Sequence, residues 1–307
     1  MEIANPQAFR RAAAPLPAAR ARRALGTLPL KLPAIAVLLL WSVGPLLMTL
    51  WFSFQRYNLL DPGQESFAGL ENYRFLLTDP GLATAIGNTL FLVGAVLAIT
   101  VGGGTLLAVL FDQDFLGRGA ARVLVIAPFF VMPTVSALIW KNMLMHPANG
   151  VISWVMTSIG LEPIDWFSSA PLASITLIVA WQWLPFATLI LLTAIQALDP
   201  ERKEAARMDG AGPVAMFFHI ILPHLGRAIG VVVMIETLFL LSVFAEIFVT
   251  TAGGPGLAST NLTFLIYRYA LLEYDIGGAS VGGVIAIVLA NIVAAFLVRA
   301  IARNIEA

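Results

Sequence analysis

The chain has 307 residues, of which 59% are apolar and only 12% are charged, and its mean hydropathy is +0.87. About a quarter of the residues of an ordinary soluble domain are charged, so this composition excludes a soluble globular protein and indicates a chain that crosses a membrane several times. The sequence contains no cysteine, which excludes disulfide bonds, thiol chemistry and cysteine-ligated metals.

The chain begins with a basic segment, residues 1–31, in which Glu2 is the single acid. We expect this segment to be a cytoplasmic tail that precedes one membrane domain at residues 32–307. About twenty helical residues cross the roughly 30 Å of membrane hydrocarbon. Six apolar segments reach this length and predict an all-α integral membrane protein with six transmembrane helices, at about 32–54, 84–111, 122–140, 172–197, 226–250 and 279–301.

The orientation follows from the placement of Lys and Arg, which are enriched in cytoplasmic loops. Most basic residues lie in the tail, near residues 118–122, in the loop at 198–224 and after residue 298. This distribution predicts that both termini and the 198–224 loop are cytoplasmic.

Small residues recur every four positions on two of the predicted helices. They are Gly94, Ala98 and Gly102 on the second, and a series from Gly278 to Ala294 on the sixth. Small residues at this spacing allow helix backbones to approach closely in a membrane, so we expect both faces to be packing faces.

The longest polar stretch between predicted helices predicts a helix, a tight turn and a second helix. Asp199 and Pro200 favour a helix start, because Asp caps free N–H groups and Pro suits the first helical position. Gly210 permits a turn conformation that other residues resist, and a second short helix begins at Pro213. We expect Pro223 to end or kink that helix.

The same stretch carries a recognisable motif. Glu204-Ala205-Ala206 is followed after three residues, the last of them Asp209, by Gly210, and after nine more by Ile220, one residue and Leu222-Pro223. This pattern resembles the signature loop of permease subunits of ABC importers. The resemblance implies that the loop docks on a separate cytoplasmic ATPase. Its candidate coupling residues are Glu204, Ala205, Ala206, Asp209, Gly210, Phe217, Ile220, Leu222 and Pro223.

Three further stretches resemble the carbohydrate-uptake, maltose-type branch of these permeases. They are the sequence FAGLENY at 67–73, Asn88-Thr89 at the start of the second predicted helix, and Gly253-Gly254-Pro255 after the fifth. The large outer domain of maltose permease has no counterpart here. The resemblance implies a bacterial inner-membrane protein and a sugar, polyol or sugar derivative as the solute.

The chain lacks the means to hydrolyse ATP through a phosphate-binding loop, since no lysine follows a glycine. The resemblance therefore implies a non-catalytic permease without a cofactor, whose partner ATPase binds ATP and magnesium. The implied partners are a second related permease, two ATPase subunits, an extracytoplasmic solute-binding protein and membrane lipid, and no nucleic acid. The three histidines lack the company of other metal ligands, so no metal site is expected.

Solute contacts are expected where polar residues interrupt the apolar helices, because such residues face a bundle interior or a cavity. On the fourth helix Gln182 is such a residue; Phe186 falls on the same helical face, and Trp181 and Trp183 flank it. An amide beside aromatic faces suits a polyhydroxylated ring.

On the fifth helix, Glu236 falls about 15 Å in from Gly226 at helical rise. Phe239, Leu240 and Val243 are expected along the same side. Equally, Glu236 could pair with the second permease and the tryptophans could pack or face lipid.

The sequence disfavours two other classes of protein. An ion-coupled secondary transporter could use Glu236, but it would carry an internal repeat with paired broken helices, which the sequence lacks. A membrane enzyme would cluster nucleophiles, bases or metal ligands near one interface, whereas the polar residues here are scattered. An exporter is disfavoured because exporters generally lack this loop motif.

Overall fold

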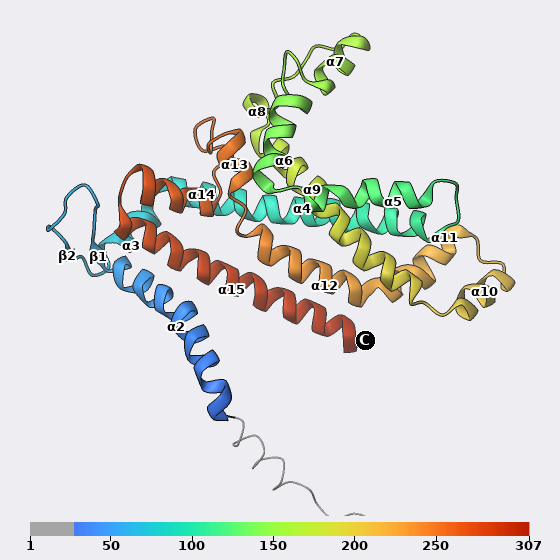
Figure 1. The fold of residues 1–307 in the computed structure, drawn as a ribbon, viewed down its shortest axis with the longest axis horizontal. Coiled ribbons are helices and arrows are strands. Elements are labelled where there is room, and N and C mark those ends of the chain that lie inside the picture. Colours follow the sequence, from blue (N-terminus) through green and yellow to red (C-terminus); the bar gives the residue numbers. More distant parts are fainter. Residues whose placement is uncertain (1–27, 307) are drawn as a thin grey trace, which may run out of the picture. The chain divides into compact units, whose positions relative to one another are not determined.

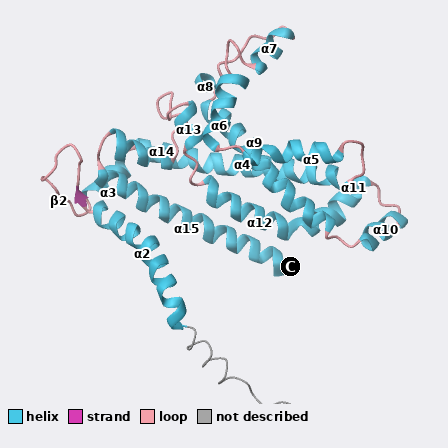
Figure 2. Cartoon of the chain, in the orientation of Figure 1, coloured by secondary structure: helices cyan, strands magenta, loops and turns pink. Residues whose placement is uncertain are grey.

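The computed structural model describes residues 28–306, so nearly all of the expected tail at 1–31 lies outside the described residues (Figure 1). The described chain is helical apart from loops and two short strands (Figure 2). It divides into two compact units, residues 1–51 and residues 52–307. The helix α2 (Leu28–Ser53) supplies the described part of the first unit and contains Pro33 and Pro45. Its length and composition suffice to cross a membrane.

The second unit is organised around two long helices, α4 (Pro80–Asp112) and α9 (Pro171–Gln196), which pack along each other (Figure 1). Gly104 makes their close approach possible, because a Cβ atom there would lie 2.9 Å from the Cβ of Ala187. Gly94 and Gly102, the expected packing face, have no atoms within 4 Å of such a Cβ. The expected face of α15 (Ile276–Glu306) does pack, since Gly282 lies against Ile266.

The third predicted helix is broken in the middle. α5 (Arg118–Ile126) continues as a 3-10 turn, η2 (Ala127–Phe130), and the chain then bends by 110° into α6 (Pro133–Ile139) and the π turn η3 (Trp140–Leu144). Five helices of the described chain are long and apolar enough to cross a membrane, and six if this bent pair is one span. The predicted six-helix all-α fold is therefore confirmed, with one span broken.

The predicted helix, turn and helix at 198–224 is present, but Pro223 does not end the second helix. α10 (Pro200–Met208) leads to Gly210, whose φ is +82° as the turn requires. α11 (Pro213–Met216), the π turn η4 (Phe217–Ile221) and α12 (Leu222–Leu240) then run on as one helical segment of 28 residues. The π turn accommodates the proline, because its wider hydrogen-bonding pattern removes the need for the bond that Pro223 cannot donate.

The fifth helix is shorter than expected, since it ends at Leu240 and α13 (Ala245–Thr250) starts separately. Backbone carbonyls freed at this break are satisfied by side chains that lie further along the chain. The Asn261 amide donates to the Val243 carbonyl at 2.5 Å, and the Thr263 hydroxyl donates to the Leu241 carbonyl at 3.2 Å. These bonds permit irregular backbone inside an apolar protein.

Short elements complete the second unit. They are β1 (Gln55–Arg56) paired antiparallel with β2 (Ser66–Phe67), α3 (Glu71–Thr78), α7 (Val151–Ser158), α8 (Trp166–Ser169), α14 (Leu262–Tyr267) and the π turn η5 (Arg268–Leu272). Asp79 joins η5 to the long helix α4, because it caps α4 and accepts a hydrogen bond from the Tyr269 hydroxyl at 2.7 Å. Burial, together with this bond, raises the pKa of Tyr269.

The contact between α4 and α9 can be tested by adding bulk at Gly104. We expect Gly104→Leu to destabilise the purified chain by about 1–3 kcal/mol, the usual cost of overpacking. Gly94→Leu is the matched control, because it adds the same side chain on the same helix where nothing lies within 4 Å. Thermal unfolding in detergent, followed by circular dichroism, measures both. Equal melting temperatures for the two variants would contradict the assigned contact.

Candidate functional site

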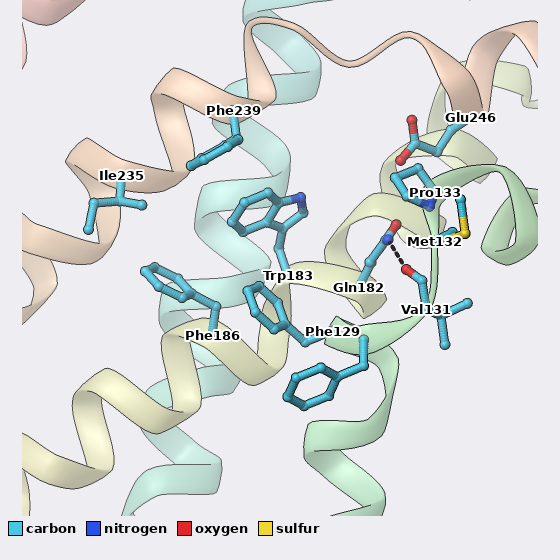
Figure 3. Close-up of a pocket in the computed structure, with 11 residues that line it drawn as sticks. Phe129, Val131, Met132, Pro133, Gln182, Trp183, Phe186, Ile235, Phe239 and Glu246 are labelled. Atoms are coloured by element: carbon cyan, nitrogen blue, oxygen red, sulfur yellow. Dashed lines mark hydrogen bonds between the residues drawn. The ribbon is translucent and has the colours of Figure 1, made fainter. Parts of the chain in front are cut away.

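A cavity of about 430 Å³ lies where the broken third span meets α9, α12 and α13 (Figure 3). The break in the third span forms one wall and the middle of α9 forms another. Its lining residues are Phe129, Phe130, Val131, Met132, Pro133, Gln182, Trp183, Phe186, Ile235, Phe239 and Glu246. The cavity is large enough for a small organic ligand.

Aromatic rings from three helical segments cluster at this cavity. The Trp183 ring lies 5.1 Å from Phe239 and 5.9 Å from each of Phe129 and Phe186, measured between ring centroids. Phe129 and Phe186 are also stacked at 5.9 Å. The cluster presents broad apolar faces, and its contacts hold Trp183 in position against three neighbours.

Gln182 is the polar residue that holds the break in the third span. Its amide Nε2 donates to the backbone carbonyl of Val131 at 2.7 Å, which satisfies a carbonyl that a continuous helix would have used (Figure 3). The side chain is only 6% exposed. Its Oε1 has no hydrogen-bond partner among the described residues, so one buried acceptor beside the cavity is left unpaired.

Four of the residues expected to contact solute line this cavity, namely Gln182, Trp183, Phe186 and Phe239. The others lie elsewhere. Trp181 packs edge-on against Trp140 at 5.7 Å, and Leu240 and Val243 belong to a buried apolar cluster with residues of α4 and α9.

Glu236 does not line the cavity and is fully buried between α12 and α4. The Thr100 hydroxyl donates to its Oε2 at 2.6 Å, while Oε1 has no partner among the described residues. This position fits neither the expected solute contact nor pairing with a second permease through an exposed face. Glu236 instead joins two helices of the same chain.

Sequence reasoning missed the wall at residues 129–133 and the position of Glu246 at the cavity. Pro133 was the available signal for the wall, because a proline within an apolar span marks a place where the helix can break. Glu246 is only 4% exposed, and its carboxyl group lies at the cavity (Figure 3). No local sequence pattern predicts the position of Glu246, since this residue follows a break in the fifth helix.

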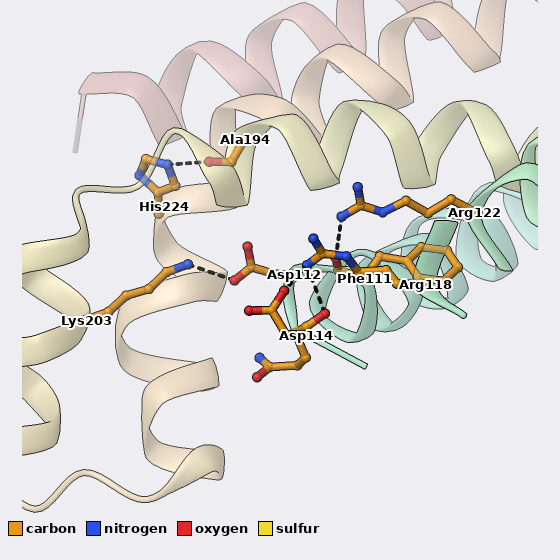
Figure 4. Close-up of polar contacts among 9 residues, drawn as sticks. Phe111, Asp112, Asp114, Arg118, Arg122, Ala194, Lys203 and His224 are labelled. Carbon is orange, nitrogen blue, oxygen red and sulfur yellow. Dashed lines mark hydrogen bonds and ion pairs between the residues drawn. The ribbon is translucent and has the colours of Figure 1, made fainter. Parts of the chain in front are cut away.

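The 198–224 loop is anchored on one side and exposed on the other. Lys203 Nζ lies 2.8 Å from Asp112 Oδ2 at the end of α4, and a ring nitrogen of His224 lies 3.0 Å from the Ala194 carbonyl of α9 (Figure 4). Phe217 and Ile220 pack against a buried cluster built from α4, α9 and α12. The candidate coupling residues thus fall into two groups.

The exposed group is Glu204, Ala205, Asp209 and Gly210, together with Pro223, while Ala206, Phe217, Ile220 and Leu222 are half-buried. Charged and small side chains on the free side suit contact with another protein. The apolar side chains fix the loop to the helices. The structure therefore presents the motif as an accessible projection that is anchored to the helices.

The pair formed by Thr100 and Glu236 gives a direct test of the packing between α4 and α12. Thr100→Val keeps the shape of the side chain but leaves a buried carboxyl group without a donor, so we expect a loss of about 1–3 kcal/mol of stability. Thr84→Val is the control, because Thr84 lies exposed on the same helix and bonds only within that helix. Thermal unfolding compares them, and an unchanged melting temperature for Thr100→Val would show that Glu236 does not depend on this bond.

Residues 101–307 match the family model described as the inner membrane component of binding-protein-dependent transport systems. A probable ABC transporter permease of Sinorhizobium fredii is 34% identical over 80% of this chain and 80% of its own length. The trehalose/maltose transport system permease MalF of Thermococcus litoralis is 30% identical over 87% of this chain and 89% of its own length.

A solved structure has the same fold. It is a bacterial ABC transporter involved in the import of the acidic polysaccharide alginate, one chain of which superposes with a TM-score of 0.77 and 24% identity. The match covers 92% of this chain and 96% of that chain.

Proposed function

The chain belongs to the family of inner membrane components of binding-protein-dependent transport systems, and from that premise we propose that it is the permease subunit of an ABC importer for a sugar, polyol or sugar derivative. The observation that carries the solute class is the cavity at the broken third span. It combines broad aromatic faces with a buried amide that has a free acceptor. Aromatic faces pack on the apolar faces of sugar rings, and amides bond to their hydroxyl groups.

The proposal includes an assembly. A second, related permease would complete the cavity, an extracytoplasmic binding protein would deliver the solute, and two ATPase subunits would bind ATP and magnesium. Both termini and the 198–224 loop would lie on the cytoplasmic side, as the distribution of basic residues predicts. The ATPases could then reach Glu204 and its exposed neighbours.

The fold supplies a path between the loop and the cavity. The helical segment that starts at Pro213 in the loop continues to Leu240, and Ile235 and Phe239 near its far end line the cavity. At helical rise, about 39 Å separate Pro213 from Phe239. A displacement of the loop by the ATPases would therefore shift one wall of the cavity directly, which provides alternating access.

An ion-coupled secondary transporter is not favoured. That reading required Glu236 in the solute path, but this residue is buried against Thr100 and does not line the cavity. Membership of a binding-protein-dependent family points the same way.

The experiment that tests the coupling role measures ATP hydrolysis by the complex purified through a tag on this chain and reconstituted with its binding protein and candidate sugars. We expect Glu204→Ala and Gly210→Pro to abolish stimulation by solute while the complex still assembles. Gly210→Pro acts on the turn, because proline cannot adopt the φ of +82° found there.

Glu201→Ala is the matched control, since Glu201 is an exposed acid on the same short helix but outside the motif. Solute should stimulate ATP hydrolysis by the Glu201→Ala complex as strongly as it does with the native chain. Full stimulation in both motif variants would refute the coupling role of the loop.

A further inference from the structure

The cavity wall contributed by this chain contains one acidic side chain and no basic side chain. Of its eleven lining residues, Glu246 is the single charged one, and none is Arg, Lys or His. The relatives and structures of this fold include transporters named for trehalose and maltose and for an acidic polysaccharide. Family membership therefore leaves the charge of the solute open, and the side chains that this chain contributes to the cavity bear on it.

Two acceptors lie on the same side of the cavity. Gln182 uses its amide nitrogen on the Val131 carbonyl, so the free part of its side chain is the acceptor Oε1. The Glu246 carboxyl group lies above Pro133, on the side towards which Gln182 Oε1 is directed (Figure 3). Both side chains are more than nine-tenths buried, so each acceptor is held in place and largely removed from water.

The lysine on the π turn that follows α6 is already used elsewhere. Lys141, on the π turn after α6, donates from Nζ to the Val249 carbonyl of α13 at 3.0 Å and is not a lining residue. The Trp183 indole N–H is the neutral donor that the lining side chains offer. A phosphate, sulfonate or carboxylate that lies against this wall would lose hydration without gaining a positive partner from the lining residues of this chain, which is unfavourable.

Hydroxyl groups suit the same surroundings well. A hydroxyl donates one hydrogen bond, and a polyol or sugar carries several on neighbouring carbons. Two such donors would satisfy Gln182 Oε1 and the Glu246 carboxyl group, while the ring face covers Trp183 and Phe239. Buried acceptors left without a donor are costly, so the site favours solutes that supply donors over those that supply only acceptors.

We propose that this cavity selects a polyhydroxylated solute without an anionic group, and that Glu246, together with Gln182, determines this specificity. The inference rests on the proposed function, because it assigns the cavity to the transported solute. It concerns the permease itself and is separate from any selection by a binding protein.

The test omits the binding protein for that reason. The complex is purified through a tag on this chain, placed in lipid nanodiscs and examined by saturation-transfer difference NMR with matched pairs of probes. Glucose is compared with glucose 6-phosphate and with glucuronate, and maltose, trehalose and sorbitol extend the uncharged set. We expect the uncharged probes to bind and the two anions to bind at least roughly tenfold more weakly.

Variants assign the effect to the carboxyl group. Glu246→Gln keeps the size and one acceptor oxygen, so we expect the affinity for the uncharged probe to stay within about threefold, whereas Glu246→Leu should lose roughly tenfold or more. Glu246→Lys should raise binding of glucose 6-phosphate relative to glucose. Glu162→Lys is the matched control, because Glu162 is an exposed acid that does not line the cavity. This variant should change neither the affinity for the uncharged probe nor the binding of glucose 6-phosphate relative to glucose.

The outcomes separate the two proposals. Binding of an anion by the native complex as tightly as its uncharged counterpart would overturn the specificity inference and leave the importer function intact. An effect of Glu246→Leu no larger than that of Glu162→Lys would do the same. Failure of every probe to bind would count against the cavity as a sugar site and so against the proposed solute class.

Discussion

The hydrogen bond from Gln182 to the Val131 carbonyl is the contact on which the cavity depends. Inside a membrane each backbone polar group must find a partner within the protein, and the bend at residues 131–132 removes the partners that a continuous helix would supply. The amide of α9 replaces one of them. Because the bend directs α6 away from α5, residues 129–133 become a wall instead of part of a straight rod. The residue that stabilises the break therefore also places its own free oxygen at the resulting cavity.

The second break, after α12, follows the same rule. α12 ends at Leu240, and Asn261 and Thr263 satisfy carbonyls in the following turn. This turn carries the chain into α13 and brings Glu246 to the cavity. Irregular backbone thus occurs beside the cavity, where side chains from other helices are available to bond to it. The long helices α4 and α9 pack closely at Gly104 and give these irregular segments a fixed support.

Much of the architecture could be predicted from the sequence, because the signals were local. Length and apolarity identified the spans, and Gly210 was correctly expected at a turn. Gln182, Trp183 and Phe186 were placed together because α9 is continuous and helical spacing holds along it.

The rotation of α12 could not be obtained in the same way. Ile235 and Phe239 form one stripe of that helix and face the cavity, while Glu236 and Leu240 form the adjacent stripe and face the interior. Adjacent positions on a helix differ by 100°, and both stripes are mostly apolar. The glutamate suggested the wrong stripe, because a carboxyl group inside a membrane is expected to face water. Its actual partner, Thr100, lies 136 positions away in the sequence, so no local pattern could identify it.

The buried pair also bears on how motion would pass through the chain. The loop is tied to α4 through Lys203 of α10 and Asp112, and its second helix, from Pro213, continues without a break into α12. The bond between Thr100 and Glu236 joins α4 to α12 again, closer to the cavity. Two helices connected at both levels move as a unit more readily than they slide past each other, since sliding would leave a buried carboxyl group without its donor. In the proposed importer, the relative movement that opens and closes the cavity therefore falls at the breaks beside it, at residues 131–132 and after Leu240, where side-chain bonds replace the backbone bonds of a helix.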